Sequence, residues 1–122
     1  NNNLAEAQKM LESAVAARPD DANIIDSLGW AAYLQGNYQE AIEYLEQAVE
    51  LMPHDPTVND HYGDALWQLG RQTEARYQWE RALYYKPKKE DDKVRIEQKL
   101  KTGLAGLGKG VATVIKPSVG AE

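Results

Sequence analysis

The sequence predicts an all-α solenoid built from antiparallel helix pairs, on three observations. Residues 22–55 recur 34 positions later at nine identities, and half of the segment also recurs 34 positions earlier. A fixed period of this length indicates a repeat architecture. Apolar residues within each copy recur at spacings of three and four, which places them on one helix face. Pro or Gly closes each such segment, as expected where a helix ends.

The first helix is expected over residues 3–17, where Leu4, Leu11 and Val15 fall on one apolar face. It should end before Pro19, because a residue that precedes proline is pushed out of the helical region. This helix has no partner on its N-terminal side within the sequence. Its apolar face is therefore expected to be open.

The second and third helices form the clearest pair. The second is expected over 22–35, after Asp21, whose carboxylate can cap the first turn. Gly36 should end this helix, since glycine readily adopts the left-handed conformation of a helix C-terminus. The third helix, 38–51, carries a regular apolar stripe opposite a row of glutamates and stops at Pro53.

The fourth helix is expected over 56–69 and the fifth over 72–85. Asp55 and Pro56 provide an N-cap and a first helical residue. Pro87 ends the fifth helix. Because all these connections are short, neighbouring helices are predicted to run antiparallel.

A sixth helix, 90–102, is predicted to cap the stack. Val94, Ile96 and Leu100 are its few large apolar residues, and the remainder is mostly charged. Lys99 lies in the last turn, where a cation suits the helix dipole. The end of a solenoid requires such a helix, with one apolar side that packs on the last repeat and one polar side that faces solvent.

The chain therefore divides into a solenoid over 1–102 and a glycine-rich tail over 103–122, which we expect to be flexible. Within the solenoid the units are a half repeat (1–21), two full repeats (22–55 and 56–89) and a capping helix (90–102). The sequence begins without Met and inside a repeat, so we expect the natural N-terminus to be missing, leaving cytoplasmic and periplasmic locations equally open.

Composition excludes several classes of function. The chain has no Cys, which rules out disulfides and thiolate metal sites. No apolar run approaches the roughly 20 residues of a membrane span. Residues 19–70 contain ten acidic residues and no Lys or Arg, whereas residues 71–101 contain ten basic and six acidic ones. An acidic half argues against nucleic-acid binding, which needs a continuous basic face.

The residues at the repeat period resemble the tetratricopeptide repeat family, over residues 1–89. In the middle copy the family pattern reads Ile25, Leu28, Gly29, Ala32, Gly36, Ala41, Leu45, Ala48 and Pro53. In the next copy it reads Asn59, Tyr62, Gly63, Leu66, Gly70, Ala75, Trp79, Ala82 and Pro87, and the first copy supplies Ala7, Leu11, Ala14 and Pro19. Asn59 departs from the pattern, since a large side chain is usual there, and looser packing of the last repeat is expected.

The resemblance implies a right-handed superhelix of about two and a half repeats, whose concave groove binds a peptide or protein. Groove residues carried over from the first helix of each pair are Asn23, Asp26, Trp30, Tyr33, Leu34, Thr57, Asp60, Asp64, Trp67 and Gln68. Carboxylates beside aromatics suit a partner with basic and apolar groups. The alternative interpretation is that Trp30 and Trp67 only pack between helices.

No enzymatic chemistry is predicted. The segment from Gly103 to Gly110 resembles a phosphate-binding loop but lacks the final Ser or Thr that would hold magnesium. The two histidines, His54 and His61, lack the defined spacing of a metal site. We therefore expect no catalytic residues, cofactor or metal, and the function is interpreted as that of an adaptor or scaffold module.

Self-association is the alternative function. The apolar face of the first helix could be covered by another copy, by a neighbour's sixth helix or by the tail. The candidate residues for such a contact are Leu4, Leu11, Val15, Val111, Val114 and Ile115.

Overall fold

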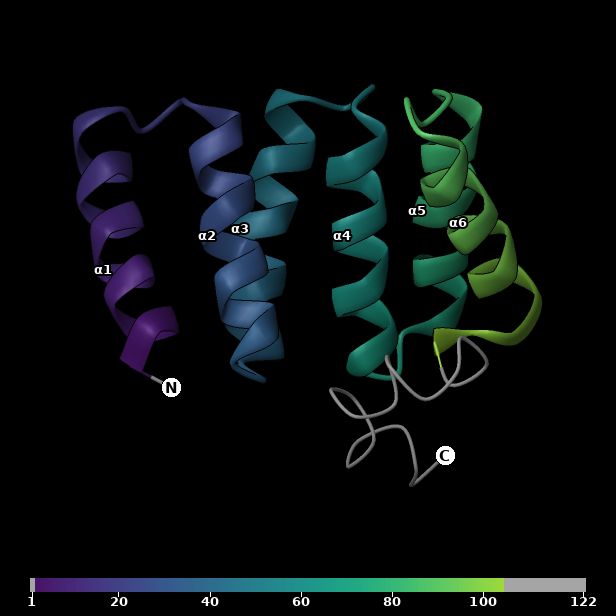
Figure 1. Cartoon of the computed structure of the whole chain (residues 1–122), viewed down its shortest axis with the longest axis horizontal. Coiled ribbons are helices and arrows are strands. Elements are labelled where there is room, and N and C mark those ends of the chain that lie inside the picture. The colour runs from purple at the N-terminus through teal and green to yellow at the C-terminus, as the bar shows by residue number, and fades with distance from the viewer. Residues whose placement is uncertain (1, 105–122) are drawn as a thin grey trace.

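A computed structural model describes the backbone of residues 2–104 and the side chains from residue 5 onward, and it consists of helices joined by short turns (Figure 1). The helices are α1 (Asn2–Ala17), α2 (Ala22–Leu34), α3 (Tyr38–Leu51), α4 (Pro56–Gln68), α5 (Gln72–Tyr84) and α6 (Glu90–Thr102). The predicted all-α fold is confirmed, and each helix boundary lies within a residue of its expected position. No helix in this part of the chain is long and apolar enough to cross a membrane.

Two antiparallel pairs, α2 with α3 and α4 with α5, form the body of the molecule. In Figure 1, α2, α4 and α6 lie on the side that faces the viewer, with α3 and α5 behind them. We call the surface formed by α2, α4 and α6 the inner face. Helix α1 stands at one end of the row and α6 at the other.

Local chemistry sets the helix ends. The carboxylate of Asp21 accepts hydrogen bonds from two amides of the first turn of α2, and that of Asp55 accepts one from Val58 N at 3.0 Å in α4. Gly36 and Gly70 end the first helix of each pair with φ of 83° and 81°. This left-handed region favours glycine and provides the usual helix termination.

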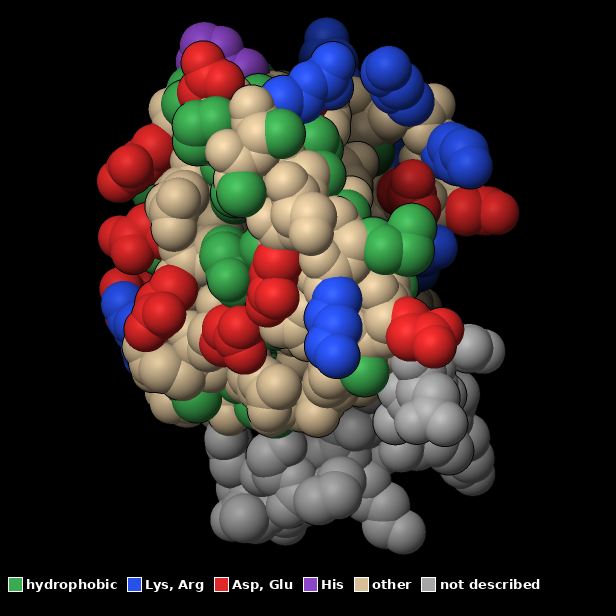
Figure 2. Space-filling view, turned by 90° about the vertical axis from the view of Figure 1, so that its left-hand side faces the viewer, with side chains coloured by type: hydrophobic (Ala, Val, Ile, Leu, Met, Phe, Trp, Pro, Cys, Tyr) green, Lys and Arg blue, Asp and Glu red, His purple; other side chains and the backbone are tan. Residues whose placement is uncertain are grey.

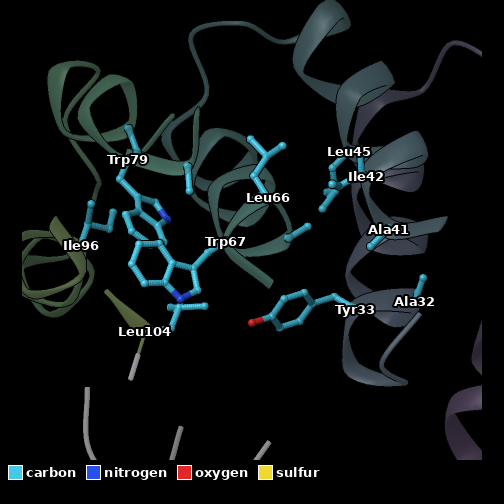
Figure 3. Close-up of a cluster of buried hydrophobic side chains, with 13 residues drawn as sticks. Ala32, Tyr33, Ala41, Ile42, Leu45, Leu66, Trp67, Trp79, Ile96 and Leu104 are labelled. Carbon is cyan, nitrogen blue, oxygen red and sulfur yellow. The ribbon is translucent and has the colours of Figure 1, made fainter. Parts of the chain in front are cut away.

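The largest buried cluster extends between the helices of both pairs, from α2 and α3 to α6 (Figure 3). Tyr33 of α2 points towards Trp67 of α4, whose ring centre lies 5.6 Å from that of Trp79 in α5. Ile96 and Leu104 close the cluster on the C-terminal side, each 1% exposed. Aromatic side chains therefore connect the last repeat to α6.

Glycines at equivalent positions allow the helices of each pair to approach closely. A methyl group added at Gly29 would lie 2.7 Å from Cγ of Leu45, and one at Gly63 would lie 2.5 Å from Nε1 of Trp79. Both distances are shorter than atomic contact allows. The repeat therefore keeps glycine where a large side chain of the second helix crosses the first.

Asn59 does not loosen the last repeat as expected. Its side chain is fully buried and donates hydrogen bonds to the carbonyl oxygens of Pro53 at 3.0 Å and Asp55 at 2.8 Å. The side-chain oxygen Oδ1 of Asn59 accepts a hydrogen bond from Arg81 Nε at 3.2 Å. A satisfied polar network thus replaces the apolar contact that the repeat pattern predicts.

Two predictions within α6 need correction. Val94 is 44% exposed and does not belong to the buried face, because the apolar stripe of α6 runs through Ile96 and Leu100 instead. Lys99 was expected to be a solvated end of the helix. It is 3% exposed and bonded to carboxylates of α4.

Candidate functional site on the inner face

The ten residues predicted for the groove lie on α2 and α4, and they are buried to different degrees. Asn23, Leu34 and Thr57 are exposed, and Asp26 and Trp30 are half-buried. The other five, Tyr33, Asp60, Asp64, Trp67 and Gln68, are buried. Four of the five predicted residues of α2 are thus exposed or half-buried, whereas four of the five of α4 are buried, and Asp60 and Asp64 are bonded to Lys99 of α6.

Lys99 of α6 binds the two aspartates of α4. Its ammonium nitrogen lies 2.8 Å from Oδ1 of Asp60 and 2.9 and 3.1 Å from the two carboxylate oxygens of Asp64. Trp79 Nε1 donates to Asp64 Oδ1 at 3.0 Å, and its ring centre is 5.8 Å from the ammonium. We call Asp60, Asp64 and Trp79 the lysine site.

The lysine site holds one cation against two carboxylates. Burial raises the pKa of Asp64 to about 6, with Lys99 opposing this rise and the charge of Asp60 adding to it. Burial lowers the pKa of Lys99, but Asp64 and Asp60 outweigh it, so the net shift is upward. Lys99 is consequently charged at neutral pH, and without it burial and the charge of Asp60 would raise the pKa of Asp64 further.

A second cluster lies between α2 and α4. The ring of Trp30 stacks on Tyr33 at 4.5 Å and on His61 at 4.1 Å, both nearly parallel. His61 Nδ1 lies 3.0 Å from Oδ1 of Asp26. We call Asp26, Trp30, Tyr33 and His61 the aromatic stack.

The charge of His61 depends on its neighbours. Burial lowers the pKa of His61, but the hydrogen bond to Asp26 and the charges of Asp26, Asp60 and Asp64 raise it by more, so the net shift is upward. A protonated imidazole stacked on an indole is further favoured by cation–π attraction. The aromatic stack therefore holds a cation more readily as pH falls.

The contacts along the inner face follow a rule that the sequence contains. Asp26 meets His61, Tyr33 meets Gln68 and Asp64 meets Lys99, each across 35 residues. This separation is the repeat period plus one. Helix α6 therefore occupies the place of the first helix of a further repeat, and this spacing is the signal by which His61 and Lys99 could have been found.

A cleft of about 320 Å³ opens between the N-terminal turns of α4 and α6, beside Asp60 and His61. Its walls carry charges of both signs. The charged residues that line it are Asp55, Asp60, Lys88, Lys89, Asp92 and Arg95. Solvent thus approaches one edge of the lysine site although the site itself is buried.

Trp67 packs between helices, in agreement with the alternative interpretation of that residue. A methyl group added at Gly103 would lie 2.2 Å from the Trp67 ring, so the backbone after α6 rests directly on the indole. Leu104 covers its edge (Figure 3). Trp67 Nε1 has no hydrogen-bond partner among the described residues.

The residues predicted for self-association are only partly described. Leu11 and Val15 are half-buried, and Val15 packs on a small cluster that contains Ile25. Met10, by contrast, is 72% exposed on α1. The side chain of Leu4 and the residues Val111, Val114 and Ile115 lie outside the described part of the chain.

Charges separate over the surface. Seen from the α1 end, acidic side chains gather on the left of Figure 2, and most basic ones lie along its top and upper right. Within residues 5–104, no three His, Asp or Glu side chains are grouped so that they could hold a metal ion.

Comparison with known protein families identifies the repeat. The family model described as tetratricopeptide repeat matches residues 1–56 and again residues 28–92. A search of curated proteins finds no match for the chain.

Proposed function

Because this chain belongs to the tetratricopeptide repeat family, whose repeats are generally protein–protein interaction modules, we propose that it binds a protein or peptide partner on its inner face. The family is a non-catalytic scaffold, and we propose no enzymatic activity. Partner binding would make the chain an adaptor, with the aromatic stack as the main contact.

The observation that carries this proposal is the half-buried position of Trp30, which is stacked between Tyr33 and His61. An aromatic side chain that is fixed by stacking and still reaches solvent loses little conformational entropy on binding. Side chains of this kind dominate interface energetics. Asn23 and Thr57 are exposed on the same two helices and provide polar contacts at the rim.

The partner is expected to present basic and apolar groups. Residues 19–70 contain no Lys or Arg, so the electrostatic potential at the surface of α2 and α3 is negative. A Lys or Arg of the partner could approach Asp26 beside the edge of the stacked Trp30 ring, and an aliphatic group could rest on Leu34, which is 41% exposed.

A paired-variant capture experiment tests the proposal. The immobilised chain, Trp30→Ala and Tyr77→Ala would each be exposed to cell extract, and captured proteins would be identified by mass spectrometry. Tyr77 is a matched control, because it is an aromatic residue 55% exposed on α5. We expect a partner that Trp30→Ala loses and Tyr77→Ala retains. Equal capture by both folded variants would remove the aromatic stack from the binding surface.

Self-association is the second candidate, supported by the exposure of Met10 on α1. A second copy that covered this helix would bury it as a neighbouring repeat buries the other helices. Light scattering over a range of concentrations would compare the chain with Met10→Lys. A monomer at all concentrations in the unmodified chain contradicts this candidate.

A further inference from the structure

We propose that the lysine site is a binding site for a lysine side chain of a partner helix, and that α6 is the internal ligand that fills it in this conformation. The inference rests on the proposed function and identifies one ligand class for the inner face. The partner is a helical segment that carries a lysine between aliphatic residues and competes with α6.

The bound form of α6 defines the ligand chemistry. Ile96, Lys99 and Leu100 lie three and four residues apart, on one side of the helix, and all turn towards the other helices. Ile96 and Leu104 are each 1% exposed. A competing helix therefore needs a lysine with one aliphatic residue three positions before it and one directly after it, and a further aliphatic residue just beyond the end of the helix, as Leu104 follows α6.

The geometry of the site selects an ammonium group. An ammonium has three N–H donors, and three carboxylate oxygens of Asp60 and Asp64 surround the nitrogen at 2.8–3.1 Å. Arginine would present a planar fork in place of this compact charge. A neutral or acidic side chain would leave two buried carboxylates uncompensated, which is strongly unfavourable. The lysine site is thus specific for lysine.

Exchange of α6 with an external ligand would begin at its outer side and at the segment that precedes it. Most of its remaining side chains are exposed, including Val94. The segment that leads into it contains Lys86 with φ of 65°, a conformation that is strained for a residue other than glycine, followed by Pro87. The cleft beside Asp60 leaves one edge of the site next to solvent. As a tethered competitor, α6 acts at an effective concentration on the order of millimolar, so an external helix binds weakly until α6 is released.

The test uses a peptide of residues 90–104 and the full chain in three forms: unmodified, Lys99→Glu and Lys101→Glu. A glutamate at position 99 places a third carboxylate in the site and expels α6. Lys101 lies on the same helix and is exposed, so its substitution is the matched control. Affinity would be measured by fluorescence anisotropy of the labelled peptide, and folding by circular dichroism.

We expect the peptide to bind Lys99→Glu at least ~10-fold more tightly than the unmodified or Lys101→Glu chain, because its tethered competitor is gone. A peptide with Lys99→Glu should bind none of them. If Lys99→Glu is unfolded by itself, the unmodified peptide should restore its helicity and the Lys99→Glu peptide should not, since a ligand of the native state shifts folding by mass action.

Equal affinity of the peptide for Lys99→Glu and Lys101→Glu would overturn the inference, as would failure to bind or to refold the former. Such a result would leave the proposed function intact, because the capture experiment depends on Trp30 and not on the lysine site. Conversely, loss of Trp30-dependent capture would not affect peptide exchange at Asp60 and Asp64.

Discussion

A single ammonium group compensates two carboxylates at the buried edge of the inner face. Replacing Lys99 by Met keeps the aliphatic stem but leaves Asp60 and Asp64 without a cation. Breaking a buried pair in this way costs about 3–5 kcal/mol of the free energy of unfolding. Urea denaturation would measure the loss. Lys101→Met, at an exposed position, should change stability by less than ~0.5 kcal/mol, and similar losses for both variants would contradict the burial of Lys99.

Two titrations predict that the chain loses stability as pH rises. The folded pKa of Asp64 is raised from 3.8 to about 6, so the native state holds this proton longer than the unfolded state does. Stability should therefore fall between about pH 4 and pH 6, by on the order of 3 kcal/mol from this group.

The pKa of His61 is likewise raised, so its contribution is fully present below pH 6.5 and is lost as pH rises through its folded value. Urea midpoints measured from pH 4 to pH 8 would test both effects. We expect Asp64→Asn to flatten the profile below pH 6 and His61→Gln to flatten it above pH 6.5. Unchanged profiles in both variants would show that other groups control the pH dependence.

Residue roles were harder to predict than residue positions. The repeat pattern predicts Asp60, Asp64 and Trp67 as groove residues of α4, whereas the structure shows all three buried. Burial of these residues depends on a helix that begins 22 residues after the end of α4, at Glu90. Charge patterning made Lys99 look solvated, because its two partners lie 35 and 39 residues away.

At the scale of the element, α6 is held at its C-terminal end by contact between backbone and indole. Gly103 has φ of 72° and ψ of −174°, a region that is open essentially to glycine alone. A methyl group there would also clash with the Trp67 ring. Arg76 adds a hydrogen bond to the carbonyl oxygen of Leu100. The end of α6 therefore depends on one glycine.

Gly103→Ala is expected to lift Leu104 from Trp67 and to destabilise the chain by about 2–4 kcal/mol, the sum of backbone strain and overpacking. Tryptophan fluorescence should shift to longer wavelength as the indole becomes exposed to water. Thr102→Ala is the control, since Thr102 is exposed and bonds only locally to Gln98 and Gly103. An unchanged emission maximum in Gly103→Ala would contradict the packing of Gly103 and Leu104 on the Trp67 ring.

The helices themselves were predictable because local residues determine where they begin and end. Asp21 and Asp55 cap helices through amides two or three residues away, and Gly36 and Gly70 end them within one turn. The position of α6 depends on contacts with residues that are distant in the sequence. Neither the exposure of Val94 nor the burial of Lys99 could therefore be predicted from local spacing.

At the scale of the whole molecule, the chain is a row of helices in which neighbours supply most contacts. Stability in such arrays is close to a sum of local and nearest-neighbour terms, so the ends open before the middle. The two ends differ here. Helix α6 is anchored by Lys99, Ile96 and Leu104, whereas α1 has no fully buried side chain between residues 5 and 17.

Helix α1 is therefore predicted to unfold locally, ahead of the rest. Its contacts with the neighbouring helices include the packing of Val15 and the hydrogen bonds of Gln8 with Gln35 and Glu40, all of which are partly exposed. Native-state hydrogen exchange followed by mass spectrometry should give α1 amides an opening free energy several kcal/mol below that of α4 and α5. Equal protection in α1 and α4 at low protein concentration would contradict the prediction. Protection of α1 that increases with protein concentration, and that Met10→Lys removes, would instead show that a second copy covers this end.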